Sequence, residues 1–134
     1  MAAESRYRPY NPNPNPNHKK DKITDCVIRA FCKAIDAEWA DVYTELSKMG
    51  LEMYAMPNDK VVWKKFLQNG GFIHHTIPRA LGSKRPTVSS FAQAHKKGTY
   101  ILQIKNHIVT CEDGLYYDTW DCGNKSLYAY WEKA

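Results

Sequence analysis

The sequence predicts an α+β fold in which N-terminal helices pack on a C-terminal antiparallel sheet. Up to Gly98, apolar residues recur at the three- and four-residue spacing that is typical of amphipathic helices. From Thr99 onwards the spacing changes to two, which is typical of strands. Helices that precede the strands, instead of alternating with them, argue against a parallel βαβ sheet. A chain of 134 residues suits one domain with a single core.

The first 22 residues form a polar arm. Asn and Pro alternate from Asn11 to Asn17, and a residue that precedes proline is driven away from the helical conformation. We therefore expect residues 1–22 to be flexible or extended, either unstructured or lying along the surface. Residues 23–134 are expected to form the domain.

Two helices are expected directly after the arm. The first runs from Cys26 to Ile35, and Asp25 is a suitable N-cap residue for it. The second begins near Trp39 and is expected to end at Gly50, since glycine commonly terminates helices.

Two further helices are expected before the strands. Asn58 or Asp59 can cap a third helix, which the Gly-Gly pair at 70–71 should stop. Thr87 can cap a short fourth helix, which Gly98 should close.

The C-terminal third is expected to contain the strands. Asp113-Gly114 is a strong two-residue turn signal between two runs of alternating residues, so a hairpin is predicted around it. The predicted strands cover residues 99–104, 108–111, 115–120 and 127–131.

Composition and charge narrow the functional classes. The net charge is +5, and part of it lies in the arm, which can either contact phosphates or remain a solvated tail. The basic residues of the arm are Arg6, Arg8, Lys19, Lys20 and Lys22. No stretch is long and apolar enough to span a membrane and no signal peptide follows Met1, so a cytoplasmic protein is expected.

The four cysteines are expected to be free thiols in that compartment. They do not form a paired CxxC pattern, so no metal site is expected. The sequence also lacks a glycine-rich phosphate loop, and no cofactor is expected.

Cys26 is the candidate nucleophile. It occupies the first position of the first predicted helix, where unpaired N–H groups and the positive end of the helix dipole lower the pKa of a thiol. A thiolate with a base nearby is a nucleophile at neutral pH. The alternative is that Cys26 is a small buried packing residue.

His107 is the candidate base, and the register of the hairpin supplies its partner. If Asp113-Gly114 is a two-residue loop, Asp118 lies diagonally from His107 on the same face of the sheet. Asp118 would then orient the imidazole and stabilise the imidazolium. If the loop has three residues, the matching face carries Asp121 instead, which is the fallback carboxylate.

Four segments carry a resemblance to a known family: residues 25–30 (DCVIRA), 98–102 (GTYIL), 107–109 (His-Ile-Val) and 116–121 (YYDTWD). The nucleophile at a helix start, followed by the base and the carboxylate on strands, resembles the papain-like cysteine peptidases. The short chain and the carboxylate third member look similar to their bacteriocin-leader peptidase branch. The segments also resemble a group of short, mostly uncharacterised proteins of phages and bacteria. The resemblance implies a papain-like fold.

The resemblance also identifies one departure. Many papain-like enzymes place a glutamine six residues before the nucleophile to stabilise the oxyanion, whereas this chain has Lys20 there. Lys20 itself or Asn17 would have to serve, together with the backbone N–H of Cys26. Trp120 follows Asp118 by two residues and is the candidate for contacting substrate and shielding the Asp–His contact, or is simply a core residue.

The leading hypothesis is therefore a cysteine hydrolase that cleaves peptide, isopeptide or other amide bonds through a thioester intermediate. Its partner would be a protein or peptide substrate, and no membrane partner is expected. The alternative is a catalytically silent binding module with a papain-like fold, whose basic arm and aromatic residues contact nucleic acid or a protein.

Overall fold

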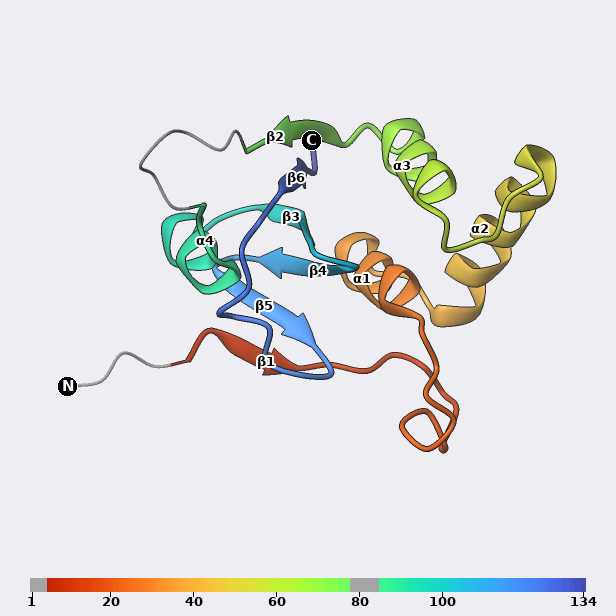
Figure 1. The fold of residues 1–134 in the computed structure, drawn as a ribbon, viewed down its shortest axis with the longest axis horizontal. Helices are drawn as coiled ribbons and strands as arrows, with labels where there is room; N and C mark the ends of the chain where they lie inside the picture. The colour runs from red at the N-terminus through yellow and green to blue at the C-terminus, as the bar shows by residue number, and fades with distance from the viewer. Residues whose placement is uncertain (1–4, 78–84) are drawn as a thin grey trace.

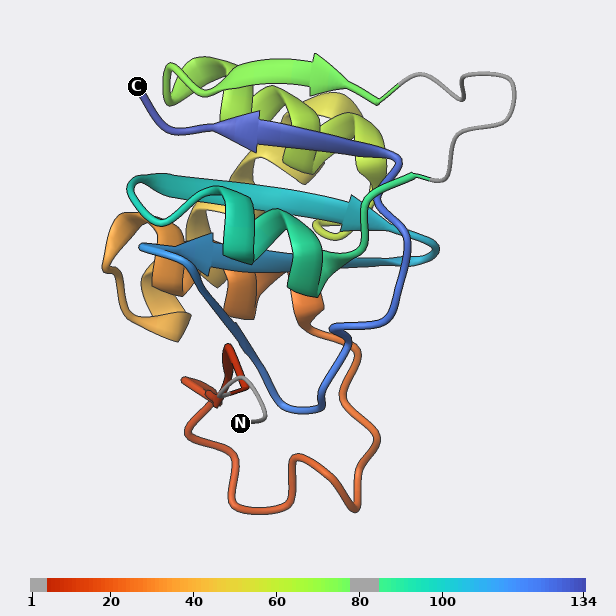
Figure 2. The same ribbon diagram turned by 90° about the vertical axis from the view of Figure 1, so that its left-hand side faces the viewer.

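The computed structural model describes residues 5–77 and 85–134 and contains one mixed sheet with helices on both faces. Three helices, α1 to α3, cover one face of the sheet, and the short α4 lies on the other (Figures 1 and 2). The described helices are α1 (Cys26–Ile35), α2 (Trp39–Met53), α3 (Lys60–Asn69) and α4 (Val88–Ala94). The α+β class predicted from the sequence is confirmed.

The six described strands lie in the order β1-β5-β4-β3-β6-β2. Their bounds are β1 (Tyr7–Pro9), β2 (Ile73–Thr76), β3 (Thr99–Ile104), β4 (His107–Glu112), β5 (Leu115–Asp118) and β6 (Ala129–Glu132). All pairs are antiparallel except that of β1 with β5. The sheet is therefore not purely C-terminal, because β1 and β2 form its two edges.

Helix α1 has the predicted bounds, but two predicted end signals act differently. Asp25 occupies the N-cap position of α1, yet its side chain makes no capping hydrogen bond. Helix α2 continues past Gly50 to Met53 and ends with Tyr54 in the left-handed conformation. A Cβ atom on Gly50 would lie 2.7 Å from the carbonyl oxygen of Ala55, so this glycine permits close packing instead of ending the helix.

The later helices follow their predicted caps more closely. Helix α3 begins after Asp59 and ends at Gly70. Thr87 and Ser90 form a capping box at the start of α4. Helix α4 ends at Ala94, before Gly98, so Gly98 is part of the following turn and not of the helix end.

The predicted hairpin has the predicted register. Glu112 pairs with Leu115, and Asp113 and Gly114 both have positive φ, which is the geometry of a two-residue type I′ turn. Strand β4 begins at His107, one residue earlier than predicted, and β5 ends at Asp118. The last strand is shifted to Ala129–Glu132 from the predicted 127–131.

The described part of the arm, from Ser5 onwards, lies along the domain. Strand β1 pairs in parallel with β5, so that Tyr7 is opposite Tyr116 and Pro9 is opposite Asp118. In the Asn-Pro repeat that follows, three asparagine side chains each accept a hydrogen bond from the backbone N–H two residues later, at 2.9–3.1 Å. These consecutive Asx turns fix an irregular course that neither helix nor strand signals describe.

The core has two parts, one on each face of the sheet. The larger packs α1, α2 and α3 against the sheet and centres on Phe31, Leu46 and Val62, which are fully buried. The smaller packs α4 against the other face through Val88 and Leu127. In the described part of the chain, no helix combines the length and apolar character needed to cross a membrane.

Candidate active site

Cys26 lies at the N-terminal end of α1, which packs against the central strand β4. The first N–H groups of a helix have no partners within it, so the positive end of the helix dipole lies at this thiol. Cys26 is partly buried and lines a pocket of ≈ 250 Å³ together with His107. The nucleophile candidate is therefore beside the base candidate at a hollow on the surface.

His107 and Asp118 lie at adjacent ends of β4 and β5, and their side chains are hydrogen-bonded. Nε2 of His107 is 2.5 Å from Oδ2 of Asp118, and the two side chains are 11% and 3% exposed. The second ring nitrogen, Nδ1, is not used by Asp118. Cys26 lines the same pocket as His107, and each of the two side chains shifts the pKa of the other. The structure thus brings together the three residues that the sequence indicated.

The pKa values of the two partners move in opposite directions. Burial raises the pKa of the Cys26 thiol, but the hydrogen bond from His107 and the positive charge of that ring outweigh burial and lower it. Burial lowers the pKa of His107, but hydrogen bonds to Asp118 and Cys26 outweigh it and raise the pKa to about 9. Both shifts favour a thiolate beside an imidazolium.

Asp118 is held from several sides. Its Oδ1 accepts a hydrogen bond from the backbone N–H of Thr119 at 2.7 Å and lies 3.2 Å from Nη2 of Arg29. Its Oδ2 accepts a weak hydrogen bond from the thiol of Cys122, with the sulfur 3.6 Å away. The carboxylate that faces His107 is therefore both fixed in orientation and compensated in charge.

Arg29 connects Asp118 to a second buried carboxylate, Asp25. Asp25 and Arg29 are one helical turn apart, and their side chains form an ion pair. The other three donors to Asp25 are Asn13 at 2.9 Å, His18 at 2.8 Å and Trp39 at 2.8 Å. The hydrogen bonds and Arg29 outweigh burial and lower the pKa of Asp25. This junction, which joins the arm to the triad, is the feature that the sequence did not reveal.

The fallback carboxylate, Asp121, has a different role. Its Oδ1 accepts hydrogen bonds from the hydroxyl of Tyr116 at 2.6 Å and from the backbone N–H of Gly123 at 2.9 Å. Asp118 takes the position beside His107, as the two-residue loop requires.

The predicted oxyanion residues do not line the pocket at the thiol. Lys20 and Asn17 are both exposed in the turn of the arm, and neither lines the pocket at Cys26. The arm reaches α1 through the buried Asp25, and the side chains of Lys20 and Asn17 stay exposed to solvent before that point. The pocket is lined by the polar side chains of Thr24, Asn58, Gln103 and Asn106 and by Lys60, none of which the sequence indicated as site residues.

Trp120 covers one side of the imidazole. Its ring lies 5.0 Å from the ring of His107, tilted by 41°, and the residue is 42% exposed. It is therefore not a core residue. One face shields His107, and the rest of the indole remains available for contact.

The three other cysteines are buried free thiols. Burial, as the largest cause, raises the pKa of Cys32 to about 11 and that of Cys111 to about 12. Cys122, His107 and Asp118 each offer one possible metal-ligand atom, and these three atoms lie within 4.8 Å of one another. Burial and the charge of Asp118 raise the pKa of Cys122, so its protonated thiol serves as a donor to Asp118 and is a poor metal ligand.

Comparison of the chain with protein-family models, with curated proteins and with solved structures finds no match.

Proposed function

We propose that this protein is a papain-like cysteine hydrolase that acts on peptide or other amide bonds through Cys26, His107 and Asp118. The observation that carries the proposal is that Cys26 and His107 line one pocket, with Asp118 bonded to the far side of the imidazole. In this arrangement the pKa of the thiol is lowered and that of the imidazole is raised to about 9. A thiolate–imidazolium pair at a surface pocket is the ground state that thiol hydrolases need. The buried carboxylate of Asp118 behind the imidazole completes the constellation.

The reaction follows from the positions of these groups. The Cys26 thiolate attacks the carbonyl carbon, and the electron pair moves to the carbonyl oxygen. When the tetrahedral intermediate collapses, the His107 imidazolium gives its Nδ1 proton to the departing amine, which leaves an acyl thioester. A water molecule then loses a proton to His107 as it attacks the thioester. The carboxylic acid departs, and the thiolate–imidazolium pair is restored.

Oxyanion stabilisation falls to groups at the start of α1 and around the pocket. The backbone N–H of Cys26 is the first of the helix and has no partner within it. The side chains of Thr24, Asn58 and Gln103 line the same pocket and can supply a second donor. These groups replace the side-chain donor that Lys20 or Asn17 was expected to provide.

The arrangement of elements supports the papain-like assignment. Helix α1 carries the nucleophile and packs on the sheet, while β4 and β5 carry the base and the carboxylate in that chain order. Chain order and element types are those that the family resemblance implies.

The function is tested by incubating the protein with a diverse peptide library and identifying the products by mass spectrometry. Hydrolysis creates new peptide ends, and deamidation converts Gln to Glu, so one readout separates the reactions. We expect the wild type and Cys32→Ala to convert peptides and Cys26→Ala to be inert. A wild type that converts no peptide, and whose Cys26 reacts with iodoacetamide no faster than Cys32, would refute the proposal.

A further inference from the structure

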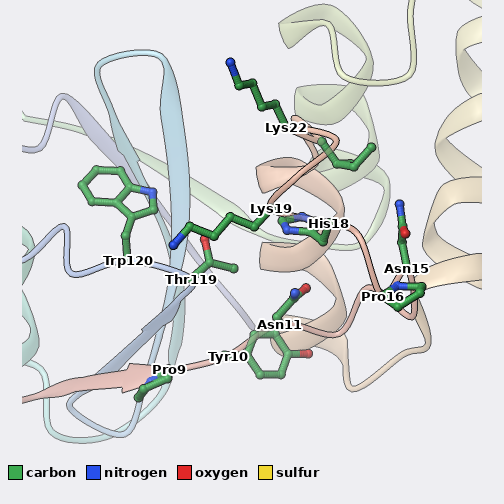
Figure 3. Close-up of a pocket in the computed structure, with 11 residues that line it drawn as sticks. Pro9, Tyr10, Asn11, Asn15, Pro16, His18, Lys19, Lys22, Thr119 and Trp120 are labelled. Atoms are coloured by element: carbon green, nitrogen blue, oxygen red, sulfur yellow. The ribbon is translucent and has the colours of Figure 1, made fainter.

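The surface around the candidate triad contains three hollows that share lining residues. The pocket at Cys26 shares Ile104 with a second pocket of ≈ 370 Å³, and that pocket shares Trp120 with a third of ≈ 740 Å³. The third pocket lies between the arm and the Thr119–Trp120 segment (Figure 3). Trp120 also packs against His107, so the three hollows adjoin one another beside the reacting groups, and we define them together as one surface.

The formal charges that line this surface have one sign. Within residues 5–77 and 85–134, five lysines line the three pockets, and no Arg, Asp or Glu residue does. Lys60 lines the pocket at the thiol, Lys105 and Lys125 line the second pocket, and Lys19 and Lys22 line the third. All five are exposed, and in the described part of the chain none lies within ion-pair distance of a carboxylate. In Figure 3 the ammonium group of Lys19 extends towards Thr119 and Trp120.

Among the described residues, no neighbouring carboxylate lines these pockets or forms an ion pair with these lysines. Asp21 and Asp59 directly precede Lys22 and Lys60, but their carboxylates accept hydrogen bonds from Asn15 and from the backbone N–H of Met56. Asp25 and Asp118 are buried and bonded to Arg29. Asp121 follows Trp120 in the sequence, but its carboxylate is bonded to Tyr116 and Gly123 outside these pockets. A surface of low-dielectric walls with unpaired charges of one sign concentrates ligands of the opposite sign.

We propose that this surface binds an acidic peptide segment, so that Asp or Glu residues flank the bond that Cys26 attacks. The inference rests on the proposed function, since a thiol–imidazole pair attacks an acyl carbon and a peptide is the anionic polymer that offers one. The lysines of the second and third pockets receive the carboxylates, and the exposed part of Trp120 contacts the peptide between them.

Fluorescent epoxysuccinyl peptides, which alkylate reactive thiols and extend to both sides of the electrophile, test this proposal. Two probes are used that differ only in carrying Glu or Gln on both sides. Each exposed ion pair between a lysine and a probe carboxylate should raise the labelling rate by roughly 1.5- to 5-fold. The Glu probe should therefore label Cys26 on the order of 5- to 20-fold faster than the Gln probe at low salt. The Glu-to-Gln rate ratio should approach one near 1 M salt, where the screening length is about 3 Å.

Charge variants locate the effect. Lys19→Gln with Lys22→Gln, and separately Lys105→Gln with Lys125→Gln, should each reduce the Glu-to-Gln ratio by roughly 2- to 5-fold. The matched control, Lys48→Gln with Lys97→Gln, removes the same charge at exposed positions that do not line these pockets, and should leave the ratio unchanged.

The results that would overturn the inference differ in whether they also remove the proposed hydrolase function. Equal labelling by both probes, or a ratio that all three double variants alter equally, removes the acidic specificity and leaves the hydrolase intact. Protection of Cys26 by a single-stranded oligonucleotide, together with equal labelling by both probes, assigns the surface to nucleic acid instead. Failure of the Gln probe to label Cys26 faster than Cys32 removes the hydrolase and the inference together. A third probe carries Gln on both sides and a free C-terminal carboxylate. If this probe labels Cys26 as fast as the Glu probe does, the lysines bind a terminal carboxylate and the proposal of acidic side chains is wrong.

Discussion

Replacing Asp118 by Asn is the sharpest perturbation of the proposed triad. The amide keeps the shape of the side chain but loses the charge that faces His107 at 2.5 Å. The rise in the pKa of His107 from 6.5 to about 9 corresponds to roughly 3 kcal/mol of preference for the imidazolium. Because Asp118 heads the causes that raise this pKa, its replacement should remove a large part of that preference, on the order of 10-fold or more in the thiolate–imidazolium population.

Two assays follow this change. NMR titration of the His107 ring should show its pKa falling by more than one unit in Asp118→Asn. The rate of Cys26 alkylation at pH 7 should fall on the order of 10- to 100-fold, because the thiolate loses its counter-charge. The matched control is Asp121→Asn, which alters the adjacent carboxylate that does not contact His107. If Asp118→Asn folds and leaves the His107 titration where it was, the proposed role of Asp118 is wrong.

Three further predictions address the pH range, the junction with the arm and the packing of α2. The kcat/KM of hydrolysis should fall above pH about 9, because the imidazolium of His107, whose pKa is raised to that value, then loses its proton; a pH–rate profile without this limb would contradict the assignment. Asp25→Asn should lower the free energy of unfolding by roughly 3 kcal/mol at pH 7, measured by urea denaturation, since it leaves Arg29 without its nearest buried counter-charge. Gly50→Ala should lower the thermal midpoint through a loss of about 1–2 kcal/mol, because its Cβ would lie 2.7 Å from the Ala55 oxygen; an unchanged or raised midpoint would show that helix propensity outweighs this contact.

The parts of the fold and site that depend on short-range signals could be predicted from the sequence. The two-residue turn at Asp113-Gly114 fixes the hairpin register, and the register places Asp118 diagonally from His107. Apolar spacing gives α1 from Cys26, so the proposed nucleophile lies at a helix start. Each of these predictions needs only the spacing of apolar residues within one helix or strand, or the length of one turn.

The parts that depend on which distant segment supplies a partner could not be predicted. Nothing within Tyr7–Pro9 indicates that it pairs in parallel with β5, since the segment lacks an alternating apolar pattern. The side chain of Asp25 matches a capping residue locally, but tertiary donors from Asn13, His18 and Trp39 take its oxygens instead.

The pH dependence of iodoacetamide alkylation at Cys26 tests the ion pair most directly. Cys26 should react with a midpoint well below that of a free thiol at about 8.5, faster than Cys32, Cys111 and Cys122, and His107→Gln should move the midpoint upward. A Cys26 that titrates like a free thiol, or a midpoint that His107→Gln leaves in place, would contradict the account.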